Sequence, residues 1–139
     1  MRVMGLDMGE RRIGVALSDS LGLTAQRLTV IERRSIEQDL DVVAALVATH
    51  HVERIIVGLP LTLRGEQGIQ ADKVTTFAKQ LRQHVPVPVE FLDERLTTVQ
   101  GQRALRLMGT SSRKQKQIID QVAAQLILQH YLDGQQKAG

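Results

Sequence analysis

The chain has 139 residues, a length typical of one domain, and its 18 lysines and arginines outnumber 15 acids to give a formal charge of +3. It contains no cysteine, which excludes disulfide bridges, thiol nucleophiles and cysteine-ligated zinc or iron–sulfur centres. No apolar run approaches the ~20 residues of a membrane span, and the N-terminus lacks the apolar segment of a signal peptide. We therefore expect a soluble cytoplasmic protein without membrane contacts, folded as a single domain over residues 1–139.

Three short apolar segments open the chain, over residues 3–7, 13–17 and 28–32. Connections as short as these join antiparallel neighbours, whereas parallel neighbours need a long crossover, so the segments predict a meander of three antiparallel strands. After Ser35 the apolar spacing changes to the helical period, and Gln38 completes a capping-box signature three residues later. A helix is therefore expected to begin directly after Ser35.

Strands and helices alternate in the middle of the chain. A continuous apolar run over residues 55–59 is typical of a buried parallel strand. Helically spaced apolar residues from 71 to 81 predict a second helix, and residues 87–92 predict a fifth strand. Because Pro86 and Pro88 cannot donate ladder hydrogen bonds, they are expected either at the start of this strand or on a strand at the edge of the sheet.

Two more helices are expected at the C-terminal end, over about Thr97–Met108 and Lys116–Leu132. Each is followed by a glycine, Gly109 or Gly134, at a position typical of a helix C-cap. The order βββαβαβαα predicts an α/β fold with one five-stranded mixed sheet and helices on both faces.

Acidic residues stand at the ends of two predicted strands. Asp7 closes the first strand, where a carboxylate either satisfies the backbone amides of the turn or faces a ligand at the carboxyl edge of the sheet. Asp93 and Glu94 end the fifth strand, and consecutive strand residues point to opposite faces, so only one of them is expected to face such a site. The residues alone do not decide which of the two faces the site. Alternatively, the segment only forms a surface ion pair with Arg95.

A third acid, Asp120, lies in the apolar last helix. Ala123 and Ala124, three and four residues further on, allow this helix face to approach the sheet closely and would leave the carboxylate partly buried. Such a group either forms an ion pair, for which Lys116 is available one turn earlier, or joins a metal site. If Asp7, an acid of the fifth strand and Asp120 converge, their oxygens suit Mg²⁺ or Mn²⁺, and pairs of such ions hydrolyse phosphodiesters.

Four segments of the chain resemble the YqgF/RuvX family, which is similar to RuvC resolvases and has the RNase H-like fold. They are GLDMGERRIGVALSD (residues 5–19), IVGLPLTLRG (56–65), LDERLTT (92–98) and KQIIDQVAAQLILQHYLD (116–133). The resemblance covers nearly the whole chain and implies a nuclease of the two-metal-ion type, with the first and fourth strands side by side. It also implies that Asp7, Glu94 and Asp120 are the catalytic acids that hold Mg²⁺ or Mn²⁺, and thereby selects Glu94 over Asp93.

Two segments depart from the pattern of that family. Glu10 and Arg11 stand where Thr-Lys usually follows Asp-x-Gly, so a further negative charge either lies near the site or points to solvent. Thr-Leu-Arg-Gly at residues 62–65 replaces Asn-Met-Asp/Asn-Gly, which puts the role of this loop in substrate binding in doubt. The three acids themselves are present.

The leading hypothesis is a metal-dependent nuclease of structured nucleic acid that processes the precursor of 16S ribosomal RNA. The alternatives are a Holliday junction resolvase that cuts branched four-way DNA as a dimer, and a non-catalytic RNA-binding assembly factor; the chain is expected to be a monomer or a homodimer. A nucleotide-binding kinase or ATPase is disfavoured, because the chain has no GxxxxGK[ST] phosphate loop. The cations expected to contact phosphates are Arg11, Arg95, Lys114 and Lys116, with Arg103, Arg106 and Arg113 as further surface candidates.

Overall fold

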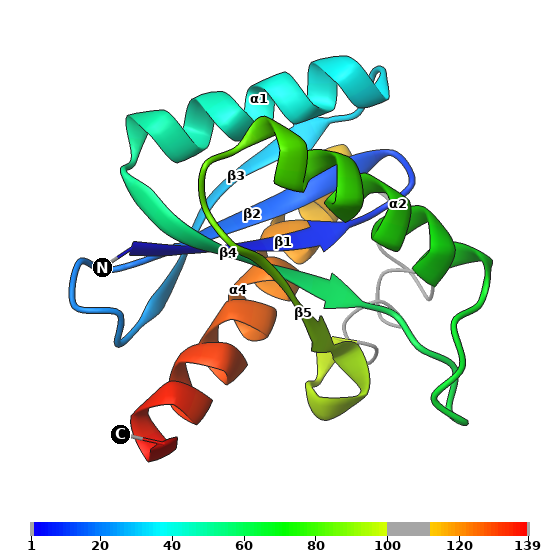
Figure 1. Cartoon of the computed structure of the whole chain (residues 1–139). Helices are drawn as coiled ribbons and strands as arrows, with labels where there is room; N and C mark the ends of the chain where they lie inside the picture. Colours follow the sequence, from blue (N-terminus) through cyan, green and yellow to red (C-terminus); the bar gives the residue numbers. More distant parts are fainter. Residues whose placement is uncertain (1, 100–111, 139) are drawn as a thin grey trace.

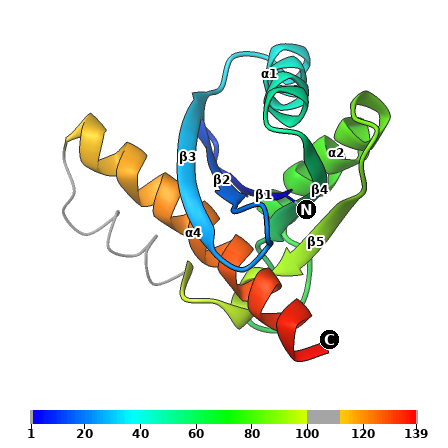
Figure 2. The ribbon, with the colours of Figure 1, turned by 90° about the vertical axis from the view of Figure 1, so that its left-hand side faces the viewer.

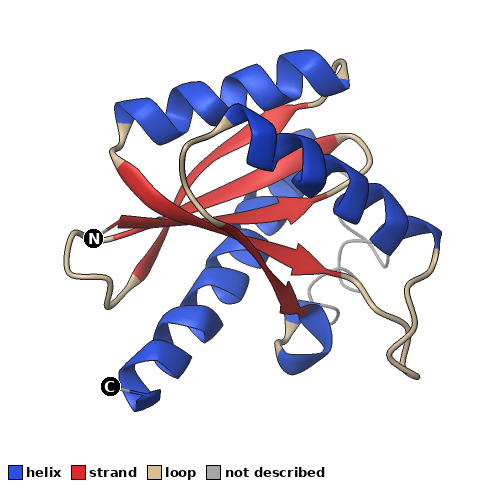
Figure 3. Ribbon diagram, viewed as in Figure 1, coloured by secondary structure: helices blue, strands red, loops and turns tan. Residues whose placement is uncertain are grey.

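The sheet is the centre of the structure, a computed structural model that describes residues 2–99 and 112–138. Its five strands lie in the order β3-β2-β1-β4-β5 (Figure 3). None of the described helices is long and apolar enough to cross a membrane. In chain order the elements are β1 (Arg2–Met8), β2 (Arg12–Ser18), β3 (Ala25–Glu32), α1 (Ile36–Thr49), β4 (Val52–Leu59), α2 (Ile69–His84), β5 (Val89–Asp93), the short 3₁₀ helix η1 (Glu94–Leu96) and α4 (Arg113–Ala138).

Strand directions confirm the mixed sheet. β1 pairs antiparallel with β2, and β2 with β3, as the short connections predict. β4 runs parallel to both β1 and β5, so the first and fourth strands are neighbours, as the family resemblance implies. β5 is an edge strand and begins directly after Pro88, where a missing N–H does not interrupt the ladder.

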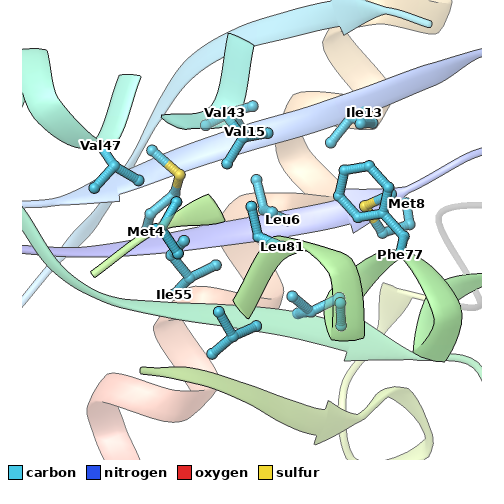
Figure 4. Close-up of a cluster of buried hydrophobic side chains, with 14 of the residues drawn as sticks. Met4, Leu6, Met8, Ile13, Val15, Val43, Val47, Ile55, Phe77 and Leu81 are labelled. Atoms are coloured by element: carbon cyan, nitrogen blue, oxygen red, sulfur yellow. The ribbon is translucent and has the colours of Figure 1, made fainter. Parts of the chain in front are cut away.

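Helices cover both faces of the sheet, as expected. Figure 2 shows α1 and α2 on one side and α4 on the other. The alternation of β1 separates its side chains accordingly. Met4 and Leu6 pack with Val43 and Phe77 of the first two helices (Figure 4), whereas Val3 packs in the cluster beneath α4.

The helix ends only partly follow the sequence prediction. α1 begins after Ser35, whose hydroxyl accepts a hydrogen bond of 3.2 Å from the Gln38 amide, so the predicted N-cap is confirmed. The predicted C-cap at Gly134 is wrong, because α4 continues through this residue to Ala138. One reason is tertiary: the Gln136 side chain donates to the carbonyl of Leu23 in the β2–β3 loop, which anchors the extra turn.

One predicted helix cannot be compared with the structure. The segment Thr97–Met108, together with Gly109, Arg103 and Arg106, lies outside the described residues except for its first three positions.

Candidate active site at the carboxyl edge of the sheet

Asp7 lies between two glycines of the neighbouring strands. It pairs with Gly14 on β2, and on β4 Gly58 directly follows Val57, the partner of Leu6. A Cβ atom on Gly14 would lie 2.0 Å from the backbone oxygen of Asp120, and one on Gly58 would lie 2.7 Å from Oε2 of Glu94. Because glycine permits such close approach, α4 and η1 can bring Asp120 and Glu94 to either side of Asp7 on the same face of the sheet.

All three acids are buried. The exposed fractions are 2% for Asp7, 1% for Glu94 and 2% for Asp120. Each of them interacts with neighbouring groups of the fold. Burying a carboxylate costs free energy unless partners or a bound cation compensate, so three buried acids around one sheet position indicate a site rather than an ordinary core.

Asp120 has an arginine partner that the sequence reasoning missed. The Nε of Arg12 donates to Oδ2 of Asp120 at 2.7 Å, and their side chains are 14% and 3% exposed. An ion pair was thus expected as one alternative for Asp120, but from Lys116 rather than from Arg12. The available signal was the strand period: Arg12 and Gly14 share a face of β2, and this face meets the helix that carries Asp120.

Asp93 and Glu94 enter different environments because β5 changes into a 3₁₀ turn between them. Asp93 caps η1, accepts a hydrogen bond of 2.9 Å from the backbone amide of Arg95, and lies 2.6 Å from the Arg95 guanidinium. Hydrogen bonds from the Arg95 side chain are the main cause that lowers the pKa of Asp93 below its ordinary value. Glu94 is buried under Gly58. The surface ion pair posed as the alternative for this segment is therefore formed by Asp93, while the adjacent Glu94 is buried beside Gly58.

A pocket of about 410 Å³ opens at the end of β1. Figure 1 shows that α1 and α2 both begin at this edge, towards which β1 and β4 point. Of the predicted site residues, the structure brings Arg11 and Asp120 into the pocket wall. Glu10, Arg12 and Gln70 also line this pocket.

The other predicted phosphate-binding cations lie outside this pocket wall. Arg95 is committed to Asp93. Lys114 and Lys116 lie in the first turns of α4, the former exposed and the latter half-buried. Arg113, a further candidate, donates to Glu32 at the end of β3.

The chemistry of Asp7, Glu94 and Asp120 suits a hard divalent cation, because three carboxylates offer only oxygen ligands. Within residues 2–99 and 112–138, however, no three acidic or histidine side chains are grouped closely enough to hold a metal ion. Asp120 is already bonded to a guanidinium, so an ion at this edge and Arg12 compete for the same carboxylate.

Comparison with known proteins places these observations in a family context. The family whose description is "RuvX: Holliday junction resolvase" matches residues 1–134. A protein of Syntrophus aciditrophicus named "Putative pre-16S rRNA nuclease" is 50% identical over 133 residues, which cover 96% of this chain and 89% of that protein. A protein of Moorella thermoacetica with the same name is 53% identical over 133 residues, which cover 96% and 95%.

Solved structures agree on the fold. Thermus thermophilus RuvC in complex with a Holliday junction matches with a TM-score of 0.61 at 15% identity, covering all of this chain and 98% of that one. The fowlpox virus Holliday junction resolvase matches with a TM-score of 0.55 at 13% identity, covering 96% and 99%. At these identities the likeness establishes a RuvC-like, RNase H-like fold.

Proposed function

The chain belongs to the RuvX family, and from this premise we propose that it is a nuclease that hydrolyses phosphodiester bonds of structured nucleic acid. The observation that carries the proposal is the burial of Asp7, Glu94 and Asp120 around one position of the sheet. A protein that only binds polyanions gains nothing from gathering acids where its ligand would lie. A nuclease gains the means to hold a cation against the scissile phosphate.

The proposed substrate is the precursor of 16S ribosomal RNA. Support comes from the shared name of relatives that are about half identical over nearly the whole chain. A nuclease of this kind acts in the cytoplasm, and we propose that a single domain over residues 1–139 performs the reaction. The net charge of +3 favours association with the polyanionic RNA.

We propose that Asp7, Glu94 and Asp120 would hold Mg²⁺ or Mn²⁺ once their side chains draw together, because among the described residues they are not grouped closely enough as they stand. Two divalent ions held there would activate the attacking water and stabilise the leaving oxygen. The chain itself orients Asp120 through Arg12, while Arg11 at the pocket wall offers a guanidinium to a phosphate oxygen. Arg95, Lys114 and Lys116 are proposed as contacts to phosphates outside the pocket.

The test compares the protein with its Asp7→Asn variant and, as a matched control, Asp41→Asn on the exposed side of α1. End-labelled structured RNA and a four-way DNA junction are incubated with Mg²⁺, Mn²⁺ or a chelator. We expect metal-dependent cleavage of RNA that Asp7→Asn abolishes and Asp41→Asn retains. Equal cleavage by Asp7→Asn and the unaltered protein would overturn the proposed site.

Junction resolution is a second candidate, because the family description and two RuvC-like structures concern Holliday junctions. In the same assay it is recognised by preferential cutting of the four-way DNA, together with a dimer in sedimentation, since two symmetric cuts need two sites. RNA cleavage by a monomer supports precursor processing. Binding of RNA without cleavage by any variant would instead support a non-catalytic assembly factor.

A further inference from the structure

A second pocket adjoins the first at the same edge of the sheet. Glu10 and Gln70 line both pockets, and the second one also has a volume of about 410 Å³. Its wall carries three cationic side chains, Arg33, Arg34 and Lys73. The two pockets therefore adjoin at Glu10 and Gln70, and together their walls extend from Asp120 past the β1–β2 turn to the beginnings of α1 and α2.

Arg33 lies in the wall of the second pocket, and its guanidinium is held by contacts to three segments. Its Nε donates to the buried Asp39 at 3.2 Å, and its Nη1 donates to the carbonyl of Gly9 at 2.9 Å. The guanidinium also lies 5.5 Å from the centre of the Phe77 ring. The charge of Asp39 is thus largely compensated by Arg33, and the β1–β2 turn is tied to both helices.

Arg34 and Lys73 supply the accessible charge. The backbone amide of Arg34 donates to Asp39 at 3.1 Å, which orients this residue, while its side chain is exposed. Lys73 lies 4.0 Å from Glu10, and these side chains are 61% and 75% exposed. An ion pair that long and that exposed contributes little and exchanges readily for another anion.

We propose that the second pocket binds a backbone phosphate that flanks the scissile one, through Arg34 and Lys73, and that Glu10 competes with this phosphate for Lys73. The inference rests on the proposed function, since it extends the path of the nucleic acid beyond the acids. Phosphate contacts of this kind add affinity without sequence preference. Glu10, which departs from the family pattern, thereby lowers the affinity for nucleic acid at the edge of the site.

The experiment measures binding and cleavage of a fluorescein-labelled RNA hairpin with a single-stranded extension. The variants are Arg34→Gln, Lys73→Gln and Glu10→Gln, and Lys79→Gln is the matched control because Lys79 is exposed on the same helix as Lys73 but does not line the pocket. Thermal unfolding of each variant verifies that it is folded. Anisotropy gives Kd at several salt concentrations, and initial rates give KM and kcat.

We expect Arg34→Gln and Lys73→Gln to weaken binding by about 3- to 10-fold, and to reduce the slope of log K against log salt by about 1 each. KM should rise more than kcat falls. Glu10→Gln should tighten binding, and less so when Lys73 is also replaced, because the two side chains compete in the same place.

Affinities and salt slopes of Arg34→Gln and Lys73→Gln that equal those of Lys79→Gln would overturn the second phosphate site. Metal-dependent cleavage that still requires Asp7 would in that case leave the nuclease proposal standing. If the unaltered protein neither binds nor cuts the RNA hairpin or the four-way DNA junction, the proposed function fails and the phosphate site fails with it.

Discussion

The guanidinium of Arg12 donates to the carboxylate of Asp120 at 2.7 Å across 108 positions of the sequence. This bond joins the first residue of β2 to the helix that closes the opposite end of the chain. It lies in the wall of the pocket where we propose that nucleic acid is cut. The pair therefore ties β2 to α4 and also holds one of the three acids that we propose as metal ligands.

Replacement of Arg12 by glutamine should separate these two roles. Without the guanidinium, the buried carboxylate of Asp120 loses a charged partner, and the free energy of unfolding of the metal-free protein should fall by about 3 kcal/mol. Mn²⁺ then no longer competes with Arg12 for Asp120, so it should raise the unfolding temperature of Arg12→Gln by more than that of the unaltered protein.

Thermal unfolding with and without Mn²⁺ measures both effects. Arg27→Gln, which removes an exposed arginine of β3, is the control and should change neither quantity. Identical stabilisation of Arg12→Gln and the unaltered protein by Mn²⁺ would show that Arg12 and the ion do not compete.

The glycines beside Asp7 predict two different costs. In Gly14→Ala the new methyl group would meet the backbone oxygen of Asp120 at 2.0 Å, and α4 must shift, at a cost of about 3 kcal/mol. In Gly58→Ala it would meet the side-chain ends of Ile127 and Glu94 at 2.5 and 2.7 Å, which can move, at a cost of about 1 kcal/mol. Both variants should lose cleavage, since each displaces an acid.

Urea unfolding and the cleavage rate of folded protein test this pair of variants. A Gly58→Ala variant that cuts as fast as the unaltered protein would mean that the position of Glu94 against β4 does not matter for the reaction.

Gly134→Ala should stabilise the protein, contrary to the role of a helix C-cap. Gly134 lies within α4 and is not among the described glycines of positive φ. Apart from its chain neighbours and the adjacent helix backbone, no atom of the described residues lies within 4 Å of the position of a new Cβ. In the interior of a helix, alanine is more stable than glycine by at most about 1 kcal/mol, and the gain in stability should be smaller near the helix end. The urea midpoint should rise; a fall would indicate that α4 ends at Gly134 in solution.

Glu32 should make stability depend on pH in the acidic range. Hydrogen bonds from Gln117 first, and then from Arg113, lower its pKa below the ordinary value. A carboxyl whose pKa is depressed by folding contributes stability above its unfolded pKa of about 4.3, and this contribution is lost as the pH falls through the folded pKa. Glu32→Gln should therefore be less stable than the unaltered protein at pH 7 and equally stable at strongly acidic pH.

Urea midpoints from pH 7 downwards measure this difference. Glu53→Gln, at an exposed position of β4, is the control and should follow the unaltered protein. A difference for Glu32→Gln that stays constant over the whole range would exclude an ionic contribution.

Local patterns in the sequence were sufficient for the five strands, for α1 and α2 and for their order along the chain. The short connections between apolar segments predicted the antiparallel meander, and Ser35 with Gln38 predicted the beginning of α1, because turns and caps depend on neighbours within a few residues. Strand periodicity likewise predicted that Asp93 and Glu94 do not share a site. The two side chains are separated for a different reason, because the chain leaves the strand at Asp93 and continues as a 3₁₀ turn.

Contacts between distant segments decided the partner of Asp120 and the end of α4. Residue spacing offered Lys116 as the ion-pair alternative for Asp120 and did not suggest Arg12, because the packing of α4 over Gly14 is what brings the helix to Arg12. The end of α4 was misplaced for the same reason, since the bond from Gln136 to Leu23 spans 113 positions. Amino-acid sequence alone thus determined which acids are present, and it placed Asp7 at the end of a strand and Asp120 in the last helix. Their burial and the approach of Asp120 to Arg12 depend on close packing across glycine, which becomes visible only in the assembled sheet.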